Sequence, residues 1–177
     1  MSVIFLAGVH GVGKGFLGTR VAKAVGVIHF TASQLIREEK GLATWGTDRK
    51  TSALDDNQVA LIRAVSQKRL IHPKILLDGH FVLRNELGIL TPLEKMVFRE
   101  LHLTGVILLT EESNIIACRL AMRDGGATDV FAISELAEAE SAHVQDVCHE
   151  LGLPLTVINS PTEESLSVAI ERLTATV

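Results

Sequence analysis

VIFLAGVHGVGKGF, residues 3–16, is the stretch that decides the fold of this chain. It begins with an apolar run, Val3 to Ala7, which has the length and composition of a buried strand. The next eight residues, Gly8 to Gly15, read GVHGVGKG and fill the G-x-x-x-x-G-K part of a phosphate-binding loop. In such a loop, glycines let backbone N–H groups surround phosphate oxygens, and Lys14 would reach the outer phosphates. The helix expected to begin near Gly13 adds its positive N-terminal end, so the stretch predicts nucleotide binding.

The eighth position of the loop departs from the usual pattern. Where Ser or Thr normally supplies a hydroxyl to Mg²⁺, this sequence has Gly15. A water molecule can replace that hydroxyl, and Asp78 can hold the outer shell of the ion. A glycine-rich turn without a ligand is the alternative, which four glycines and a lysine at this spacing disfavour. We therefore expect nucleotide binding to be retained and catalysis to be weak or altered.

Length and composition limit the other classes of function. The 177 residues fit a single domain, 1–177, and 47% hydrophobic residues are enough for a real core. A formal charge of -4 offers no general attraction for nucleic acid or an anionic membrane surface. The apolar run at the start is too short for a signal peptide or a membrane span, and no run of eighteen apolar residues occurs elsewhere. We expect a cytoplasmic protein whose partner is a small-molecule nucleotide.

Short apolar runs alternate along the chain with longer segments of helical period, which is typical of a parallel sheet covered by helices. The predicted strands are Val3–Ala7, Val27–Phe30, Lys74–Asp78, Gly105–Leu109 and Leu155–Ile158. The predicted helices are Lys14–Val25, Ala32–Lys40, Asp55–Arg69, Pro92–Leu101, Glu112–Arg123, Ser134–Leu151 and Thr162–Ala175, with Thr91, Ser134 and Thr162 as caps and Gly152 as a helix end. The helix Ser134–Leu151 is acidic on one side and is interpreted as a surface helix.

Two segments lack regular periodicity. They are Gly41–Leu54, which contains Trp45, and Asp124–Ile133, which carries paired glycines. Both are predicted to be mobile surface segments beside an active site.

Asp78 is the second candidate site residue. It ends the predicted strand Lys74–Asp78 and is followed by Gly79 and His80. The carboxyl ends of the strands are where open α/β sheets bind ligands, and a carboxylate there can hold Mg²⁺ or its water molecules. The alternative is a turn aspartate before glycine, which is a common pair. Beside the phosphate-binding loop, the metal or acceptor-site role is favoured.

Thr31, Ser33 and Arg37 form a third candidate group, on the segment that follows the second predicted strand. The first turn of a helix would present two hydroxyls there, and Arg37 could meet an anionic group. The alternative is an ordinary helix cap followed by a solvated charged face. The seven histidines are scattered, and none forms a pair with metal-ligand spacing, so no histidine metal site is predicted.

Together these features resemble the adenylate kinase and nucleoside monophosphate kinase family, and in particular its small archaeal-type and Fap-type adenylate kinase-like relatives. The resemblance is carried by Gly8 to Lys14, by Thr31 with Ser33 and Arg37, by Leu77-Asp78-Gly79-His80, and by Arg119 with Arg123. It covers most of the chain, in order. It implies a three-layer P-loop NTPase fold, α/β in class, with a five-stranded parallel sheet of order 2-3-1-4-5 flanked by helices. It also implies a mobile acceptor arm over about 31–69 and a short lid over about 123–134.

The resemblance also implies roles for the candidate residues, with ATP as donor and Mg²⁺ required. Lys14, Asp78 and Arg123 would be catalytic, and Asp78 would hold Mg²⁺ directly or through water. Arg84, six residues after Asp78, would stand for an arginine that the family often places slightly nearer. The acceptor would contact Thr31, Ser33, Arg37 and Arg84. The nucleotide would contact Gly8, His10, Gly11, Val12, Gly13, Lys14, Gly15, Phe16, Arg119 and Arg123, with His10 either touching phosphate or serving as a spacer.

One charge pattern keeps several functions open. Phosphoryl transfer needs positive charge around the transferred group, yet between Arg123 and Arg172 the chain has ten Asp or Glu and no Lys or Arg. The leading hypothesis is a kinase of the nucleoside monophosphate type. The alternatives are an ATP-binding or ATPase module that signals to a protein partner, and a kinase for another small phosphate acceptor.

Overall fold

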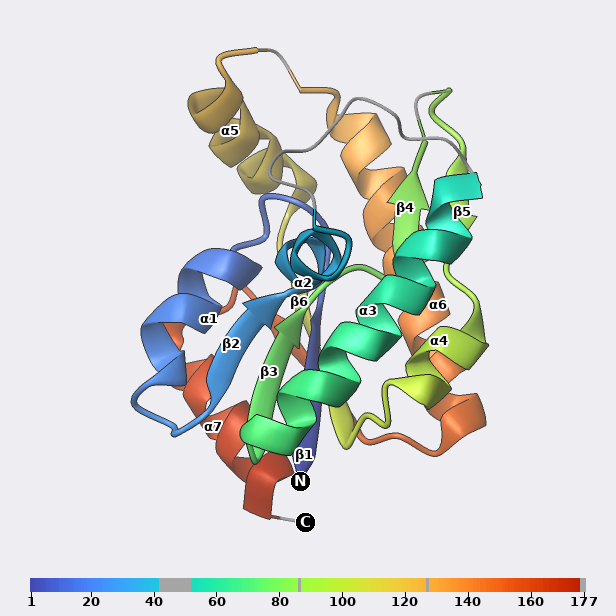
Figure 1. Cartoon of the computed structure of the whole chain (residues 1–177). Coiled ribbons are helices and arrows are strands. Elements are labelled where there is room, and N and C mark those ends of the chain that lie inside the picture. The colour runs from blue at the N-terminus through green and yellow to red at the C-terminus, as the bar shows by residue number, and fades with distance from the viewer. Residues whose placement is uncertain (42–51, 86, 127, 176–177) are drawn as a thin grey trace.

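The computed structural model describes residues 1–41, 52–85, 87–126 and 128–175 (Figure 1). Its centre is a five-stranded parallel sheet of order β2-β3-β1-β6-β7. If only these five strands are numbered in chain order, their order in the sheet is 2-3-1-4-5, as predicted. Their bounds are β1 (Ser2–Ala7), β2 (Ile28–Thr31), β3 (Lys74–Asp78), β6 (Gly105–Thr110) and β7 (Leu155–Asn159).

Helices cover both faces of the sheet. They are α1 (Lys14–Ala22), α2 (Ala32–Glu39), α3 (Ser52–Ile71), α4 (Lys95–Glu100), α5 (Ser113–Asp124), α6 (Val130–Leu151) and α7 (Glu163–Ala175). Alternate residues of β1 enter two separate cores: Phe5 packs with residues of α3, α4 and α6, whereas Leu6 packs with residues of α1, α5 and α7. A strand buried on both faces must be apolar throughout, which explains the continuous run at the start of the chain.

A two-stranded antiparallel hairpin, β4 (Val82–Arg84) and β5 (Leu90–Pro92), lies beside the main sheet. The helix predicted from Pro92 was therefore wrong at its start, and α4 begins at Lys95. Pro92 pairs with Val82 at the end of the hairpin, and the N–H of Leu93 then donates to the carbonyl of Phe81 at 2.8 Å. This pairing holds the chain extended up to Leu93, so Thr91 cannot cap a helix.

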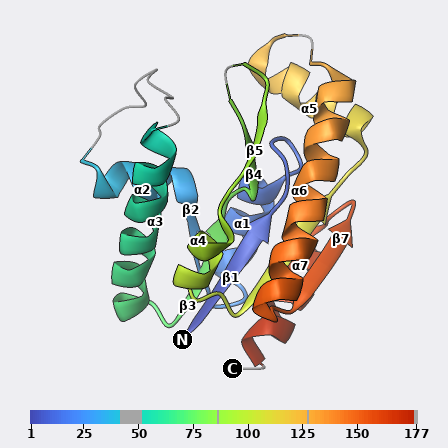
Figure 2. The ribbon, with the colours of Figure 1, turned by 90° about the vertical axis from the view of Figure 1, so that its right-hand side faces the viewer.

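The long helix α6 also starts earlier than predicted. It begins at Val130 because the side chain of Asp129 accepts a hydrogen bond from the N–H of Phe131, so Ser134 lies inside the helix. The end at Gly152 was predicted correctly, and this residue has the left-handed backbone, φ 64°, that favours glycine. Figure 2 shows α6 running alongside the hairpin of β4 and β5. The segment predicted as irregular, Asp124–Ile133, is thus helical from Val130 onward.

Residues 42–51, which include Trp45 and most of the irregular segment Gly41–Leu54, lie outside the described residues. Among the described residues, no helix is both long enough and apolar enough to cross a membrane.

Candidate functional site

The loop between β1 and α1 has the backbone of a phosphate cradle. Gly8, Gly11 and Gly13 have φ angles of 137°, 83° and 112°, in the region that favours glycine. At Gly8 a Cβ atom would lie 2.6 Å from the carbonyl oxygen of Leu109, so only glycine lets the loop pass this close to β6. Helix α1 begins at Lys14, and among the described residues no side chain caps it. The first N–H groups of a helix point out of its N-terminus, so those of α1 are directed toward the loop that precedes it, as an anion site requires.

Lys14 is buried at the bottom of this loop. Its side chain is 6% exposed, and Nζ donates to the carbonyl oxygens of Gly8 and Val9, the second at 3.3 Å. Nζ also lies 3.8 Å from Oδ1 of Asp78. Burial lowers the pKa of Lys14, while Asp78 and Glu140 act to raise it. The lysine thus stands between the loop and the end of β3.

Asp78 occupies the position that the sequence predicted, at the carboxyl end of a strand beside β1. It pairs in register with Leu6 of β1 and with Thr31 of β2. Its side chain is 12% exposed, and burial raises its pKa to about 6 against the opposing effect of Lys14. A carboxylate with this pKa is ionised at neutral pH and faces the loop lysine.

Glu140 on α6 is a part of the site that the sequence analysis missed. Its carboxylate accepts hydrogen bonds from the N–H groups of Gly8 at 3.1 Å, Phe81 at 2.9 Å and Val82 at 2.7 Å. The residue is only 1% exposed, and burial raises its pKa. It joins the first glycine of the loop to the segment that follows Asp78. The helix is therefore more than a surface helix, because one of its acidic residues is built into the site.

Helical period could have revealed Glu140. It lies four residues before Val144 and seven before Val147, and both of these valines are buried in the core. An acidic residue in phase with the apolar face of a helix must be buried, and a buried carboxylate needs partners. The acidic residues on the other face of α6 hid this signal.

One histidine, His10, lies in the loop, and another, His80, lies beside it. The rings of His10 and His80 have centroids 4.2 Å apart, and the ring of His80 hydrogen-bonds to the backbone of Gly8. Burial, followed by the charge of Lys14 and of His10, lowers the pKa of His80 well below its usual value. His80 is therefore neutral at pH 7 and contributes a hydrogen bond without charge.

The two arginines predicted on the donor side lie on α5. Nη1 of Arg119 donates to the carbonyl oxygen of Val12 at 3.2 Å, and Nη2 pairs with Glu111 at 3.0 Å. Arg123 makes a two-bond contact with Asp124, at 2.7 and 2.8 Å. The structure thus brings Arg119 against the loop, and it holds Arg123 in an exposed pair with a neighbouring carboxylate. Phe16, on the first turn of α1, is 66% exposed, with the guanidinium of Arg20 over its ring.

The predicted acceptor residues are spread over three elements, β2, α2 and β4. Thr31 caps α2 by accepting from the N–H of Gln34 at 3.2 Å, and its hydroxyl lies 3.3 Å from that of Ser33. Arg37 lies in the last turn of the same helix. Arg84 is on β4, where it donates to the carbonyls of Gly88 and Ala132, both at 3.0 Å, and pairs with Glu135 at 2.7 Å. The acceptor roles of these residues stay predictions.

Comparison with protein-family models shows the family of the chain. A family model described as an AAA domain matches residues 7–136. The chain belongs to this family. The match begins at the last residue of β1 and spans the loop, Lys14, Asp78 and the first residues of α6, so the AAA domain contains most of the candidate site. A search of the curated proteins gives no match.

Solved structures share the fold of this AAA domain. Shikimate kinase from Acinetobacter baumannii, in complex with shikimate, has a TM-score of 0.65 and 13% identity, and the likeness covers 99% of this chain and 94% of that one. A gluconokinase from Sinorhizobium meliloti 1021 has a TM-score of 0.55 and 14% identity, covering 99% of this chain and 91% of that one. At these identities the likeness shows the fold alone, which this chain shares with both kinases. The narrower resemblance to adenylate kinases stays a prediction.

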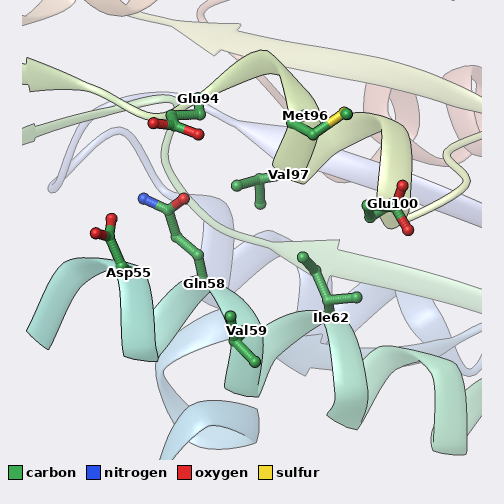
Figure 3. Close-up of a pocket in the computed structure, with 8 residues that line it drawn as sticks. All are labelled: Asp55, Gln58, Val59, Ile62, Glu94, Met96, Val97 and Glu100. Carbon is green, nitrogen blue, oxygen red and sulfur yellow. The ribbon is translucent and has the colours of Figure 1, made fainter.

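A cavity of about 260 Å³ lies between α3 and α4, away from the loop (Figure 3). Its lining comprises Asp55, Gln58, Val59, Ile62, Glu94, Met96, Val97 and Glu100. Three of these eight residues carry carboxylates, and an acidic lining repels phosphate. Within the AAA domain, the loop around Lys14 is therefore the better candidate for a nucleotide site.

Proposed function

We propose that this chain is an ATP-dependent kinase that transfers the γ-phosphoryl group of ATP to a small acceptor of the nucleoside monophosphate type. One observation carries the proposal: Lys14, which follows the glycine loop and begins α1, is buried and places its Nζ 3.8 Å from Oδ1 of Asp78 at the end of β3. A phosphate cradle alone supports nucleotide binding, whereas a carboxylate beside it supports transfer chemistry.

On the donor side, the backbone N–H groups of the loop would hold the phosphates of ATP. Lys14 would exchange its bonds to the carbonyls of Gly8 and Val9 for bonds to phosphate oxygens, and so place its charge on the transferred group. Glu140 would keep Gly8 in place while Lys14 moves, because it binds the N–H of Gly8 independently of the lysine.

The residues present fit a Mg²⁺ ion in part. Asp78 offers a carboxylate beside Lys14, and Gly15 offers no hydroxyl; a Cβ atom at Gly15 would lie 3.5 Å from Oδ2 of Asp78. Asp78 would hold the ion directly or through water, and the bound ion would supply neutralisation of the phosphate charge.

On the acceptor side, Thr31, Ser33 and Arg37 would bind the second substrate, on an arm over about 31–69. Thr31 lies in register with Asp78 on the adjacent strand, which supports an acceptor next to the donor phosphate. A short lid over about 123–134 would close on the donor side. The solved shikimate kinase holds shikimate, so the same fold also accommodates an acceptor that is not a nucleotide.

A second function, an ATP-binding or ATPase module that signals to a protein partner, is favoured by the state of Arg123. The two bonds from Arg123 to Asp124 occupy the arginine that a kinase lid would use. No other Lys or Arg follows before Arg172. Such a module needs no acceptor, and ATP occupancy would reorder the lid.

An assay of ADP formation separates these functions. The purified chain is incubated with ATP and either Mg²⁺ or Mn²⁺, with and without a panel of nucleoside monophosphates and with shikimate and gluconate, beside a Lys14→Ala control. ADP formation that depends on one acceptor and is lost in the control supports the kinase. Turnover independent of acceptor, or tight binding without turnover, rules out the kinase and supports the module.

A further inference from the structure

His29 on β2 presents a buried nitrogen to the candidate site. The side chain is 9% exposed, and Nε2 lies 3.9 Å from Oδ2 of Asp78. This nitrogen has no hydrogen-bond partner within the part of the chain that the structure describes. A buried polar atom without a partner is costly, so its retention points to a ligand that binds there.

The other nitrogen of the ring determines how Nε2 can act. Nδ1 lies 3.3 Å from Oγ1 of Thr19, one turn into α1. Burial lowers the pKa of His29. If Nδ1 donates its proton to Thr19, the lone pair of Nε2 faces the carboxylate of Asp78. Histidines that bind metals have this arrangement, in which the second ring nitrogen donates to a protein oxygen.

Two glycines of α1 leave space for the side chains of His29 and Asp78. A Cβ atom at Gly18 would lie 2.8 Å from Nε2 of His29, which excludes any larger residue unless the ring moves. A Cβ atom at Gly15 would stand in contact with Oδ2 of Asp78. Gly15, which stands where the loop hydroxyl is usual, thus lies on the same face of α1 as Gly18, beside which the ring of His29 fits.

We propose that His29 Nε2 takes the place of the missing loop hydroxyl and binds, together with Asp78, the divalent cation that accompanies ATP. This inference rests on the proposed function and specifies the metal of the same site. Mg²⁺ prefers oxygen ligands, whereas Mn²⁺ and Co²⁺ also accept imidazole nitrogen. The site therefore selects a cation such as Mn²⁺ over Mg²⁺.

Nucleotide must complete this metal site. The described residues contain no group of three or more His, Cys, Asp and Glu placed to hold a metal ion. His29 and Asp78 supply two ligands, and phosphate oxygens and water would supply the others. We expect weak Mn²⁺ binding by the protein alone and tighter binding in the presence of ATP.

Pulsed electron paramagnetic resonance of Mn²⁺ tests the proposal without relying on activity. The whole chain is measured with Mn²⁺ alone and with Mn²⁺ and a non-hydrolysable ATP analogue, after labelling its histidines with ¹⁵N. His29→Asn keeps an amide near the Nδ1 position and removes Nε2. His149→Asn, at an exposed position near the end of α6, is the matched control.

We expect imidazole ¹⁵N coupling to Mn²⁺ in the wild type and in the control, and none in His29→Asn. The Mn²⁺ affinity of His29→Asn should fall about tenfold or more, while Mg²⁺ affinity changes little. His29→Gln, which places an amide group near the Nε2 position, should shift the preference back toward Mg²⁺ and serves also if the Asn variant does not fold.

Wild-type protein without histidine coupling to Mn²⁺, both alone and with the analogue, would overturn the inference. An unchanged ratio of Mn²⁺ to Mg²⁺ affinity in both His29 variants would do the same. Calorimetric titration with the analogue separates the two proposals: binding that is lost in Lys14→Ala keeps the nucleotide site on which the proposed function depends, whatever the metal result. Histidine coupling with Mn²⁺ alone supports the metal site even if the analogue does not bind.

Discussion

The proposed donor and acceptor sides of the candidate site are built differently. On the donor side, contiguous residues of one loop supply the backbone groups, and Gly8 is fixed by both its N–H, bound to Glu140, and its carbonyl, bound to Lys14. On the acceptor side, the predicted residues are side chains on separate elements, with Arg37 on α2 and Arg84 on β4. Phosphate is common to all nucleotides, so a backbone cradle suffices for it, whereas acceptors differ and require specific side chains.

The largest expected effect is a loss of turnover when a residue of the donor side is substituted. We expect Asp78→Asn to reduce acceptor-dependent ADP formation by about a hundredfold or more, because it removes the charge beside the transferred group. ATP affinity, measured by calorimetry, should change much less. Asp146→Asn, at an exposed position of α6, is the control and should leave turnover unchanged. Equal turnover in Asp78→Asn and the wild type would remove Asp78 from the chemistry.

Substitutions of Glu140 test whether the donor side is held in place before ATP binds. Glu140→Ala leaves three buried N–H groups without an acceptor, so the free energy of unfolding should fall by about 3 kcal/mol or more. Glu140→Gln keeps one acceptor oxygen, so the free energy of unfolding should fall by less. Urea denaturation measures both variants against Glu138→Ala, at an exposed position of the same helix. A loss in Glu140→Ala no larger than in Glu138→Ala would contradict the role of the carboxylate.

The pKa of Asp78 predicts a pH dependence for the donor side. Burial raises this pKa to about 6, so the carboxyl group is mostly protonated at pH 5 and ionised at pH 7. If the ionised form is required, kcat/KM for ATP should rise about tenfold between pH 5 and pH 7 and then level off. Initial rates across this range, with Asp78→Asn alongside, provide the measurement. A rise of equal size in Asp78→Asn would assign the pH dependence to another group.

The smallest effect is expected on the acceptor side. Arg37→Ala should raise the KM for the acceptor several-fold and leave the affinity for ATP unchanged, because Arg37 would contact the anionic group of the acceptor and not ATP. Arg20→Ala, on an exposed residue of α1, is the matched control. A change in ATP affinity with no change in acceptor KM would place Arg37 on the donor side.

The same difference between the two sides explains what the sequence could predict. The loop and the five strands are contiguous patterns, and the structure confirms them, together with the sheet order. The hairpin was missed because β4 and β5 have three residues each and the Thr91-Pro92 pair is also typical of a helix start. Glu140 reaches Gly8 across 132 residues of sequence, and His29 meets Asp78 only after β2 pairs with β3. Such contacts depend on tertiary structure and leave only indirect signals in the sequence.

The central claim is that the loop from Gly8 to Gly15 binds the phosphates of ATP through Lys14. Calorimetric titration of the purified chain with ATP in the presence of a divalent cation tests it most directly, beside Lys14→Ala and Lys23→Ala, an exposed lysine just after α1. We predict that ATP binds to the wild type and to Lys23→Ala with similar affinity, and at least about tenfold more weakly to Lys14→Ala. Equal affinity in Lys14→Ala and the wild type, or no ATP binding by the wild type, would contradict the claim.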